Sequence, residues 1–307
     1  MIFSVVSPVY NGEGILFELV NRIKSSLANF EGQYEIILVD DGSIDNSWNE
    51  IESIALGSSQ IVAIKLTRNY GQNLAIRAGV DISAGDFILV MDCDLQDNPE
   101  YINLLYQKTQ EGFDIVFTKR IKQKHNVVKK ALSSVYYLLS SYLISGLFSE
   151  RYGSMVIFNR KVANCYMLVN DHNSHYLQIL NWIGFRKTHV FIEHAERFKG
   201  QSSYTLNKLI ILGLNSIIAH SNRLLKFSVY SGFLLLSISF YYLFINIFSR
   251  DLENTKSNHF MLMAGIFFSS GIILLNMGII GLYIGRTFNQ TKNMPLYFVE
   301  TQLNSTD

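Results

Sequence analysis

The most informative segment of the chain reads Phe87-Ile88-Leu89-Val90-Met91-Asp92-Cys93-Asp94-Leu95-Gln96-Asp97-Asn98-Pro99-Glu100. It begins as an uninterrupted apolar run, which predicts a buried strand. Acids follow at once, and Asn98 before Pro99 is typical of a helix start, because Asn caps helices and Pro suits their first turn. Asp92 and Asp94 are therefore expected at the carboxyl end of a strand, where open α/β sheets bind ligands.

Asp92 and Asp94 stand two residues apart, so on an extended segment their side chains point the same way. Such carboxylates repel each other unless a cation lies between them. Oxygen ligands of this kind suit Mg²⁺ or Mn²⁺, which would in turn bridge phosphate oxygens of a nucleotide. A solvated acidic turn at a strand end is the alternative, because Asp-x-Asp is a short pattern.

The composition of the 307-residue chain excludes some classes of protein. The net charge of +1 gives no global field that would attract nucleic acid. Hydrophobic residues make up 49% and mean hydropathy is +0.17, so apolar residues are expected to concentrate somewhere. Cys93 and Cys165 have neither metal nor redox spacing, which excludes a disulfide framework. The N-terminus is not a signal peptide, so this part is expected in the cytoplasm.

Short apolar runs alternate with amphipathic segments along the first part of the chain. Because these runs do not alternate apolar with polar residues, they predict a mostly parallel sheet with helices on both faces, an α/β fold. Pro8 and Gly12 are expected to end the first strand, and Gly85 stands where a helix C-cap is expected. The predicted strands are 2–6, 35–39, 61–66, 87–91, 114–118, 155–158 and 187–192, and the predicted helices are 16–27, 45–56, one through Arg77, 99–111 and 161–169.

Polar clusters follow three of the predicted strands, at residues 8–13, 40–43 and 92–97. The carboxyl ends of parallel strands meet at one edge of a sheet. Acids scattered over a surface would not fall repeatedly at that one topological position. The convergence of these loops predicts a nucleotide site at this edge.

Four motifs resemble, in order and spacing, the GT-A glycosyltransferases of family 2. They are Pro8-Val9-Tyr10-Asn11-x-Glu13, Val39-Asp40-Asp41-Gly42-Ser43, Asn69-x-Gly71-x-Asn73 and Met91-Asp92-x-Asp94-Leu95-Gln96-Asp97. The resemblance implies a Rossmann-like GT-A domain in which Asp92, Asp94 and Gln96 hold Mg²⁺ or Mn²⁺ on a nucleotide-sugar diphosphate. It further implies that uracil and ribose contact Pro8, Tyr10, Glu13 and Asp41, within a donor site that also includes Asn11, Asp40, Asn69, Asn73 and Asp92.

Two later motifs depart from related patterns. Gln178-x-x-Asn181-Trp182 is close to the Gln-x-x-Arg-Trp pattern of processive family 2 synthases, but Asn181 replaces the arginine, which counts against a polymer-making enzyme. The loop Arg197-Phe198-Lys199-Gly200-Gln201-Ser202-Ser203 resembles the Arg-x-x-Gly-x-Ser-Lys loop of polyprenyl-phosphate glycosyltransferases, with serine in place of lysine. The planar guanidinium of Arg197 suits a diphosphate, and a basic surface loop is the alternative. Related enzymes often carry Gly-Asp where this chain has Gly153-Ser154.

The second half of the chain contains membrane-like segments. Residues 119–148 join a basic run to an amphipathic segment, which suits an anionic membrane surface; an ordinary charge run before a core helix is the alternative. The charge-free runs 227–248 and 260–285 are each long enough to cross a hydrocarbon core of roughly 30 Å. Basic residues on their outer flanks place the catalytic domain and both termini in the cytoplasm, at the inner (plasma) membrane. The loop 249–259 would then be external.

The order of these segments resembles the bacterial polyprenyl-phosphate glycosyltransferases, such as undecaprenyl-phosphate glucosyltransferases. It implies a cytoplasmic catalytic domain at 1–205, a juxtamembrane helix at 206–226 and a cytoplasmic tail at 286–307. Within this tail, the polar residues 293–307 are expected to be loosely ordered. The implied reaction moves a sugar from a nucleotide-sugar to a polyprenyl phosphate with inversion at the anomeric carbon. The resemblance implies that the nucleotide-sugar is a UDP-sugar. Two spans also leave apolar surface for a homo-oligomer.

The chemistry of such a transfer depends on where cations are needed. A lipid phosphate is anionic near neutral pH, so its oxygen can attack without a strong general base. The leaving diphosphate, by contrast, needs a metal ion and a second positive contact, for which Arg197 is the candidate. Arg120 is the first candidate for the acceptor phosphate and Lys129 the second. One alternative is transfer to a sugar hydroxyl, with Asp97 as the available base. Another is a membrane sugar-binding subunit that has lost catalysis.

Overall fold

The computed structural model describes residues 3–30, 33–120, 152–170, 175–193, 223–248, 255–292 and 294–304. The chain divides into two compact units. The first unit comprises residues 1–135, 147–206 and 295–307, and the second comprises residues 136–146 and 207–294.

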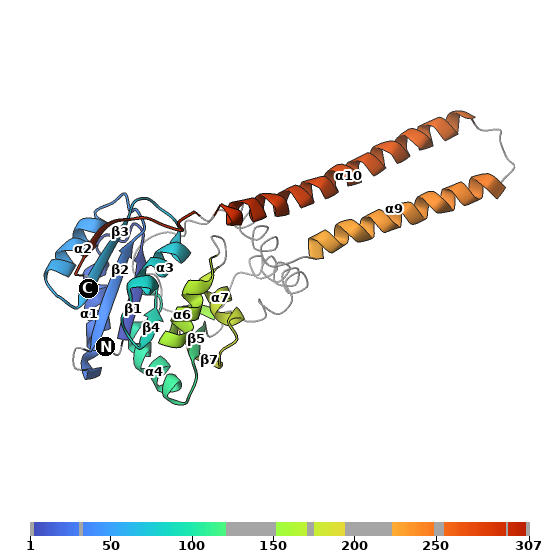
Figure 1. Cartoon of the computed structure of the whole chain (residues 1–307). Helices are drawn as coiled ribbons and strands as arrows, with labels where there is room; N and C mark the ends of the chain where they lie inside the picture. Colours follow the sequence, from blue (N-terminus) through green and yellow to red (C-terminus); the bar gives the residue numbers. More distant parts are fainter. Residues whose placement is uncertain are drawn as a thin grey trace. The chain divides into compact units, whose positions relative to one another are not determined.

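The first unit contains an eight-stranded mixed sheet with the strand order β7-β5-β6-β4-β1-β2-β3-β8 (Figure 1). The four neighbours β4, β1, β2 and β3 are mutually parallel, whereas β6 runs antiparallel to β4 and β5, and β8 runs antiparallel to β3. The strands are β1 (Phe3–Val9), β2 (Tyr34–Asp40), β3 (Ile61–Leu66), β4 (Phe87–Val90), β5 (Ile115–Arg120), β6 (Tyr152–Asn159), β7 (Lys187–Ile192) and β8 (Val299–Leu303).

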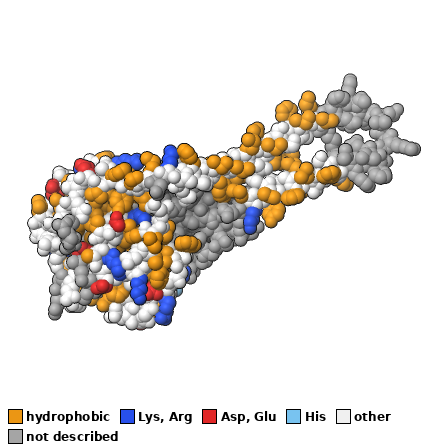
Figure 2. All heavy atoms as spheres, in the orientation of Figure 1, with side chains coloured by type: hydrophobic (Ala, Val, Ile, Leu, Met, Phe, Trp, Pro, Cys, Tyr) orange, Lys and Arg blue, Asp and Glu red, His pale blue; other side chains and the backbone are white. Residues whose placement is uncertain are grey.

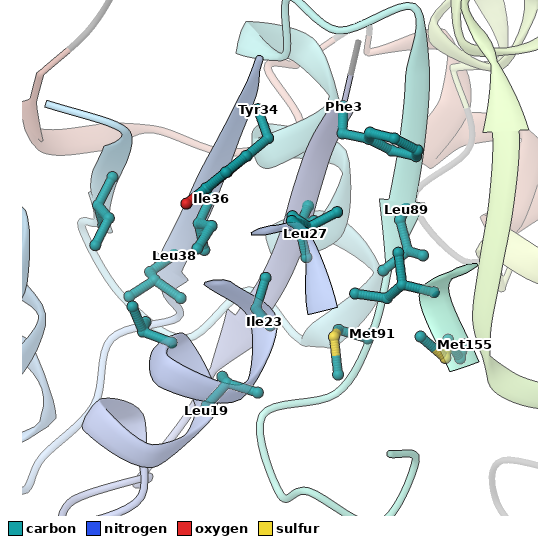
Figure 3. Close-up of a cluster of buried hydrophobic side chains, with 14 of the residues drawn as sticks. Phe3, Leu19, Ile23, Leu27, Tyr34, Ile36, Leu38, Leu89, Met91 and Met155 are labelled. Atoms are coloured by element: carbon teal, nitrogen blue, oxygen red, sulfur yellow. The ribbon is translucent and has the colours of Figure 1, made fainter. Parts of the chain in front are cut away.

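Helices cover both faces of this sheet, as the unalternating strands predict. Helices α1 (Leu16–Ser26), α2 (Ser47–Leu56) and α4 (Ile102–Gln110) pack on one face. Helices α3 (Gln72–Ile82), α6 (Arg160–Leu168) and α7 (Tyr176–Trp182) pack on the other. Alternate residues of the strands from β5 to β3 therefore enter different cores, so that Ile36 and Leu38 of β2 lie on the first face and Ile37 and Val39 on the second. Figure 3 shows the first core, where α1 contributes Leu19 and Ile23.

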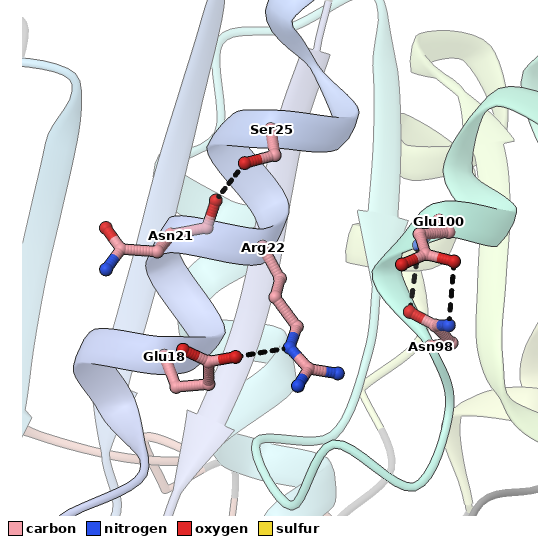
Figure 4. A network of polar contacts seen from close by, with 6 residues as sticks. All are labelled: Glu18, Asn21, Arg22, Ser25, Asn98 and Glu100. Atoms are coloured by element: carbon pink, nitrogen blue, oxygen red, sulfur yellow. Dashed lines mark hydrogen bonds and ion pairs between the residues drawn. The ribbon is translucent and has the colours of Figure 1, made fainter.

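The predicted helix start after the Asp92 segment is confirmed. Asn98 Oδ1 accepts a hydrogen bond from the backbone N–H of Glu100 at 3.3 Å, and Pro99 opens a short 3₁₀ turn, Pro99–Tyr101, that leads into α4. The Asn98 amide also donates to the Glu100 carboxylate at 3.1 Å (Figure 4). This cap fixes where the loop after β4 ends, and therefore the length of the loop that carries the acids.

Two turn predictions in the sequence are wrong. Pro8 does not end the first strand but lies within β1, opposite Val39 of β2. Its missing N–H removes no hydrogen bond between strands. The backbone groups of alternate β1 residues, Pro8 among them, point toward β4, and the pairing of β1 with β4 already ends at Val6. Gly85 is not a helix cap, because α3 ends at Ile82. It is required instead by close approach, since an added Cβ would lie 2.6 Å from the Ser4 nitrogen.

The polar tail was expected to be loosely ordered, and this prediction is also wrong. Residues 299–303 form β8 along the outer edge of β3, and the Phe298 carbonyl accepts from the Thr67 N–H at 3.0 Å. Tyr297 donates to the Asp81 carboxylate at 2.8 Å. Asn304, at φ 58°, donates its amide to the carbonyls of Ala55, Ser58 and Ile61. The polar residues of the tail thus serve as an edge strand with specific partners.

The second unit contains the long helices α9 (Arg223–Phe248) and α10 (Thr255–Thr291). Within the described residues, one stretch is long and apolar enough to cross a membrane, Gly265–Gly285 of α10. The described apolar stretch of α9, Ser228–Tyr241, is shorter. Apolar side chains lie along both helices (Figure 2), and the Asn276 amide of α10 donates to the Ser231 hydroxyl of α9 at 3.3 Å. The amphipathic segment predicted at 119–148 lies almost wholly outside the described residues.

Candidate active site

The four parallel strands at the centre of the sheet end side by side, and each is followed by a polar loop. Because β4, β1, β2 and β3 are neighbours and point the same way, their loops meet at one edge of the sheet (Figure 1). Three of these loops carry the predicted clusters at 8–13, 40–43 and 92–97. The fourth, after β3, carries the motif Asn69-x-Gly71-x-Asn73.

The loops after β1 and β2 are joined by reciprocal hydrogen bonds. Asn11, at φ 53°, accepts from the Ile44 N–H through its side-chain oxygen at 3.1 Å, and its own N–H donates to the Ser43 hydroxyl at 3.0 Å. The Gly12 N–H donates to the Ser47 hydroxyl at 2.8 Å, and the Glu13 N–H donates to the Asp45 carboxylate at 3.2 Å. Asn11 therefore orders the loop backbone with its side-chain oxygen.

Asp41 joins the loop after β2 to the loop after β3. Its two carboxylate oxygens accept from the N–H groups of Tyr70 at 2.7 Å and Gly71 at 2.9 Å, and the residue is only 2% exposed. The next residue, Gly42, has φ +67°, and an added Cβ would lie 2.5 Å from the Arg68 carbonyl carbon. The Asp-Gly pair thus brings the two loops into direct backbone contact.

The loop after β4 holds its two acids by different contacts. The Gln72 side chain, at the start of α3, donates to Asp92 Oδ1 at 2.5 Å. Asp94 Oδ1 accepts from the Gln96 N–H at 3.1 Å. Leu95, which follows Asp94 and precedes Gln96, is buried and has φ 57°. This is an unusual conformation for a leucine, and it turns the backbone within the acidic loop.

The donor atoms of this loop fit a divalent metal ion that is shared with a substrate. Asp92 and Asp94 supply hard carboxylate oxygens, and Gln96 supplies an amide oxygen. Among the residues described, no three His, Cys, Asp or Glu side chains gather as a metal centre. Mg²⁺ is commonly held by one or two carboxylates together with substrate phosphates, so a pair of acids is the expected protein share of such a site.

Asp97, the candidate base for transfer to a hydroxyl, is only 2% exposed. Its carboxylate accepts from the Ser154 hydroxyl at 2.6 Å, and the Ser154 carbonyl accepts from the Tyr176 hydroxyl. Ser154, the β6 residue that departs from the Gly-Asp pattern of related enzymes, therefore contacts a carboxylate in the loop after β4. This arrangement joins β6 and α7 to the loop after β4 and leaves Asp97 little surface for an acceptor.

The other residues predicted to bind the nucleotide-sugar differ in their exposure and in their contacts. Pro8 is buried in β1, whereas Tyr10 is 48% exposed and Asn69 is exposed beyond β3. Asn73 accepts from the Tyr176 N–H at 3.3 Å, so its side chain contacts the first residue of α7. The predicted Arg197 and Lys129 lie outside the described residues, as does the side chain of Arg120, the last residue of β5.

Two positions at this edge were missed by reasoning from the sequence. Gln72 contacts Asp92 although it stands at an unassigned position of the third motif. Ser47 accepts from the Gly12 N–H and donates to Asp45 at 2.5 Å, which fixes the loop after β1 from the first residue of α2. A polar residue at the first turn of a helix after a strand was the available signal in both cases.

Burial shapes the protonation of this edge. It raises the pKa of Asp40, although hydrogen bonds from Ser43 oppose the shift, and it raises the pKa of Asp41 to about 6. It also raises the pKa of the Cys93 thiol to about 12, with Asp92 and Asp94 adding to the effect. The thiolate form of Cys93 is therefore disfavoured at neutral pH.

The raised pKa of Asp41 predicts a pH dependence of stability. Between the unfolded value of 3.8 and the folded value of about 6, Asp41 holds more protons in the folded chain than in the unfolded chain, so its contribution to the free energy of unfolding falls as pH rises through that window. The loss is about 3 kcal/mol at full effect. Urea unfolding followed by the fluorescence of Trp48 and Trp182, the only two tryptophans, measures it. Desolvation by burial lowers the pKa of His175 to about 4, which opposes this trend, so the contribution of Asp41 is the difference in slope between the wild type and Asp41→Asn. Equal slopes in the two proteins would contradict the assignment.

Similarity to known sequences gives the family. A model described as "Glycosyl transferase family 2" matches residues 4–167. Glycosyltransferase YkcC of Bacillus subtilis (strain 168) is 33% identical over 97% of this chain and 93% of its own length. The undecaprenyl-phosphate 4-deoxy-4-formamido-L-arabinose transferase of Klebsiella pneumoniae (strain 342) is also 33% identical, over 97% of this chain and 92% of its own.

Similarity to solved structures confirms the predicted GT-A fold. The glucosyl-3-phosphoglycerate synthase of Mycobacterium tuberculosis, solved with Mn²⁺, UDP and phosphoglyceric acid, matches with a TM-score of 0.51 at 20% identity. The match covers 71% of this chain and 76% of that one, and at this identity it concerns the fold alone. The family match, by contrast, covers more than half of the sequence. The chain is therefore a glycosyltransferase and belongs to glycosyl transferase family 2.

Proposed function

We propose that this glycosyltransferase transfers a sugar, with inversion, from a UDP-sugar to a polyprenyl phosphate at the cytoplasmic face of the plasma membrane. The observation that carries the proposal is the meeting of four polar strand-end loops, with Asp92 and Asp94 among them, in a chain that also has a membrane-length apolar helix. Relatives named undecaprenyl-phosphate transferases align over nearly the whole chain, membrane segment included, which supports the lipid acceptor.

The path of the chain supports two membrane spans. The catalytic sheet contains β1 to β7 before the membrane segment and β8 after α10. Both ends of the second unit thus return to one sheet, which lies on one side of a membrane. The segment between them must then cross the membrane an even number of times. If α10 crosses once over Gly265–Gly285, α9 is the partner span.

On the donor side, the described residues would act mainly by positioning. Asp92, Asp94 and Gln96 would hold Mg²⁺ or Mn²⁺, which supplies positive charge to the leaving diphosphate when bound. Asp41 and Asn11 order the loops that would surround the nucleoside, because both accept from backbone N–H groups of neighbouring loops. Exposed Tyr10 offers a ring against which a base could stack.

On the acceptor side, the proposal needs no general base. The phosphate oxygen of a lipid phosphate attacks the anomeric carbon as an anion while the bond to the nucleotide diphosphate breaks, so inversion follows from a single displacement. Arg120 and Lys129 would contact this phosphate, and Arg197 would contact the leaving group. Transfer to a hydroxyl is less well supported, because its candidate base Asp97 is buried and accepts from Ser154.

Product analysis tests the proposal. Membranes that contain the chain are incubated with undecaprenyl phosphate, Mn²⁺ and a panel of labelled UDP-sugars, against membranes that lack it. We expect a labelled lipid that releases its sugar in mild acid, since a phosphate-linked sugar is acid-labile. An acid-stable glycoside would instead indicate a hydroxyl acceptor. Binding of UDP-sugar without any transfer or hydrolysis would indicate a sugar-binding subunit.

A further inference from the structure

An apolar groove runs between the two helices of the second unit and has no role in the chemistry above. It has a volume of about 420 Å³, within the range of about 300–1,000 Å³ that is usual for small-molecule sites. Leu225 of α9 forms one wall. The lining from α10 consists of Ile280, Tyr283, Ile284, Thr287, Phe288 and Thr291.

The groove changes character along its length. Ile280, Tyr283 and Ile284 belong to the stretch Gly265–Gly285, which would lie in the hydrocarbon of a membrane. The lining residues that follow this stretch are Phe288 and two threonines, Thr287 and Thr291, so the threonine hydroxyls of the lining lie toward the end of α10. Both threonine hydroxyls donate to backbone carbonyls of α10. At about 1.5 Å per residue, the lining extends roughly 16 Å along the helix axis, across the boundary of the hydrocarbon.

A cation stands at the polar end of this groove. The ammonium group of Lys292 lies 4.6 Å from the centre of the Phe288 ring, and Phe288 is itself a lining residue. Lys226 directly follows Leu225, the lining residue of α9, and is exposed. The groove is therefore apolar where the membrane is apolar and is flanked by lysines where the helix leaves it. That pattern complements an amphiphile with an anionic head and a hydrocarbon tail.

We propose that this groove binds the prenyl chain of the lipid acceptor, with the phosphate end toward Lys292. The inference rests on the proposed function, from which the acceptor takes its chemistry. It deepens that function because it assigns the hydrocarbon of the acceptor, and so its chain-length preference, to residues of α9 and α10. The first isoprene units next to the phosphate would occupy the groove.

A kinetic comparison of two tryptophan variants tests this assignment. Ile284→Trp fills the groove, whereas Leu274→Trp places the same bulk on an exposed position of α10 that does not line it. With the full chain in detergent, Ile284→Trp should raise the KM for undecaprenyl phosphate at least about tenfold, the loss expected when roughly two methylene groups lose their burial. The KM for the UDP-sugar should not change. Equal KM values for undecaprenyl phosphate in the two variants would overturn the inference.

Photolabelling of the wild-type chain gives an answer that depends neither on a variant nor on turnover. The probe is a prenyl phosphate that carries a benzophenone within its first isoprene units. We expect adducts within residues 280–291 that undecaprenyl phosphate displaces and phosphatidylglycerol does not. Adducts elsewhere, or equal displacement by phosphatidylglycerol, would overturn the inference. Absence of transfer to undecaprenyl phosphate by the wild-type chain would instead count against the proposed function, whatever the labelling shows.

Discussion

Asp94→Ala is expected to abolish sugar transfer while the chain still folds and enters the membrane. Asp94 lies in the loop after β4, and its Oδ1 accepts from the Gln96 N–H, so the change removes a carboxylate together with this local hydrogen bond. Losing such a bond costs about 1 kcal/mol of stability, too little to unfold a domain. Losing an electrostatic contact to the leaving group costs roughly 10²–10³-fold in rate. Turnover of UDP-sugar and undecaprenyl phosphate in the presence of Mn²⁺ measures the effect.

The matched control for Asp94→Ala is Glu111→Ala. Glu111 is an exposed carboxylate that pairs with Lys108 on the surface, where ion pairs contribute little. The Glu111→Ala variant should retain sugar transfer, with the same dependence on Mn²⁺ concentration as the wild type. A second arm titrates the wild-type chain with EDTA, which should stop transfer, and adding Mn²⁺ back should restore it. Full activity of Asp94→Ala would refute the role of this loop in holding a metal ion.

Local patterns in the sequence predicted the scaffold well. The apolar runs specified seven of the eight strands, because each carries its own local signal; six of them are buried on both faces, and β7 is buried on one. The cap at Asn98 was equally local, since its partner Glu100 is two residues away. Convergence of the loops followed from the rule that parallel strands end at one edge. These inferences needed no contact between distant parts of the chain.

The features that the sequence did not reveal depend on distant partners. The strand β8 is half polar and short, and it became a strand only because the open edge of β3, more than two hundred residues earlier, accepts it. The contact of Ser154 in β6 with Asp97 and that of Gln72 in α3 with Asp92 likewise join the loop after β4 to separate elements. Pro8 also depends on a distant partner. Proline usually breaks a strand, but it is tolerated at this position of β1 because the pairing with β4 has already ended at Val6.

Gly42→Ala is expected to have the largest effect on stability, and it should also weaken binding of the UDP-sugar. Gly42 has φ +67°, which costs an alanine roughly 1 kcal/mol. Its added Cβ would also lie 2.5 Å from two backbone atoms, the Arg68 carbonyl carbon and the Asn69 nitrogen, which cannot rotate away as a side chain could. Overpacking of this kind costs about 1–3 kcal/mol, so the free energy of unfolding should fall by about 2–4 kcal/mol. Urea unfolding followed by tryptophan fluorescence measures it.

Gly57→Ala is the matched control for this change. Gly57 follows α2 with φ −81°, and the atoms nearest to an added Cβ lie 3.5 Å away, so alanine should be neutral or slightly stabilising. The contrast isolates close approach from the general effect of replacing a glycine. Gly42→Ala should also move the loop at 68–71 away from Asp41, whose carboxylate then loses the Tyr70 and Gly71 N–H groups. Calorimetry with UDP-sugar and Mn²⁺ should therefore show weaker binding for Gly42→Ala but not for Gly57→Ala. Equal stability and affinity in the two variants would show that the loops after β2 and β3 do not depend on Gly42.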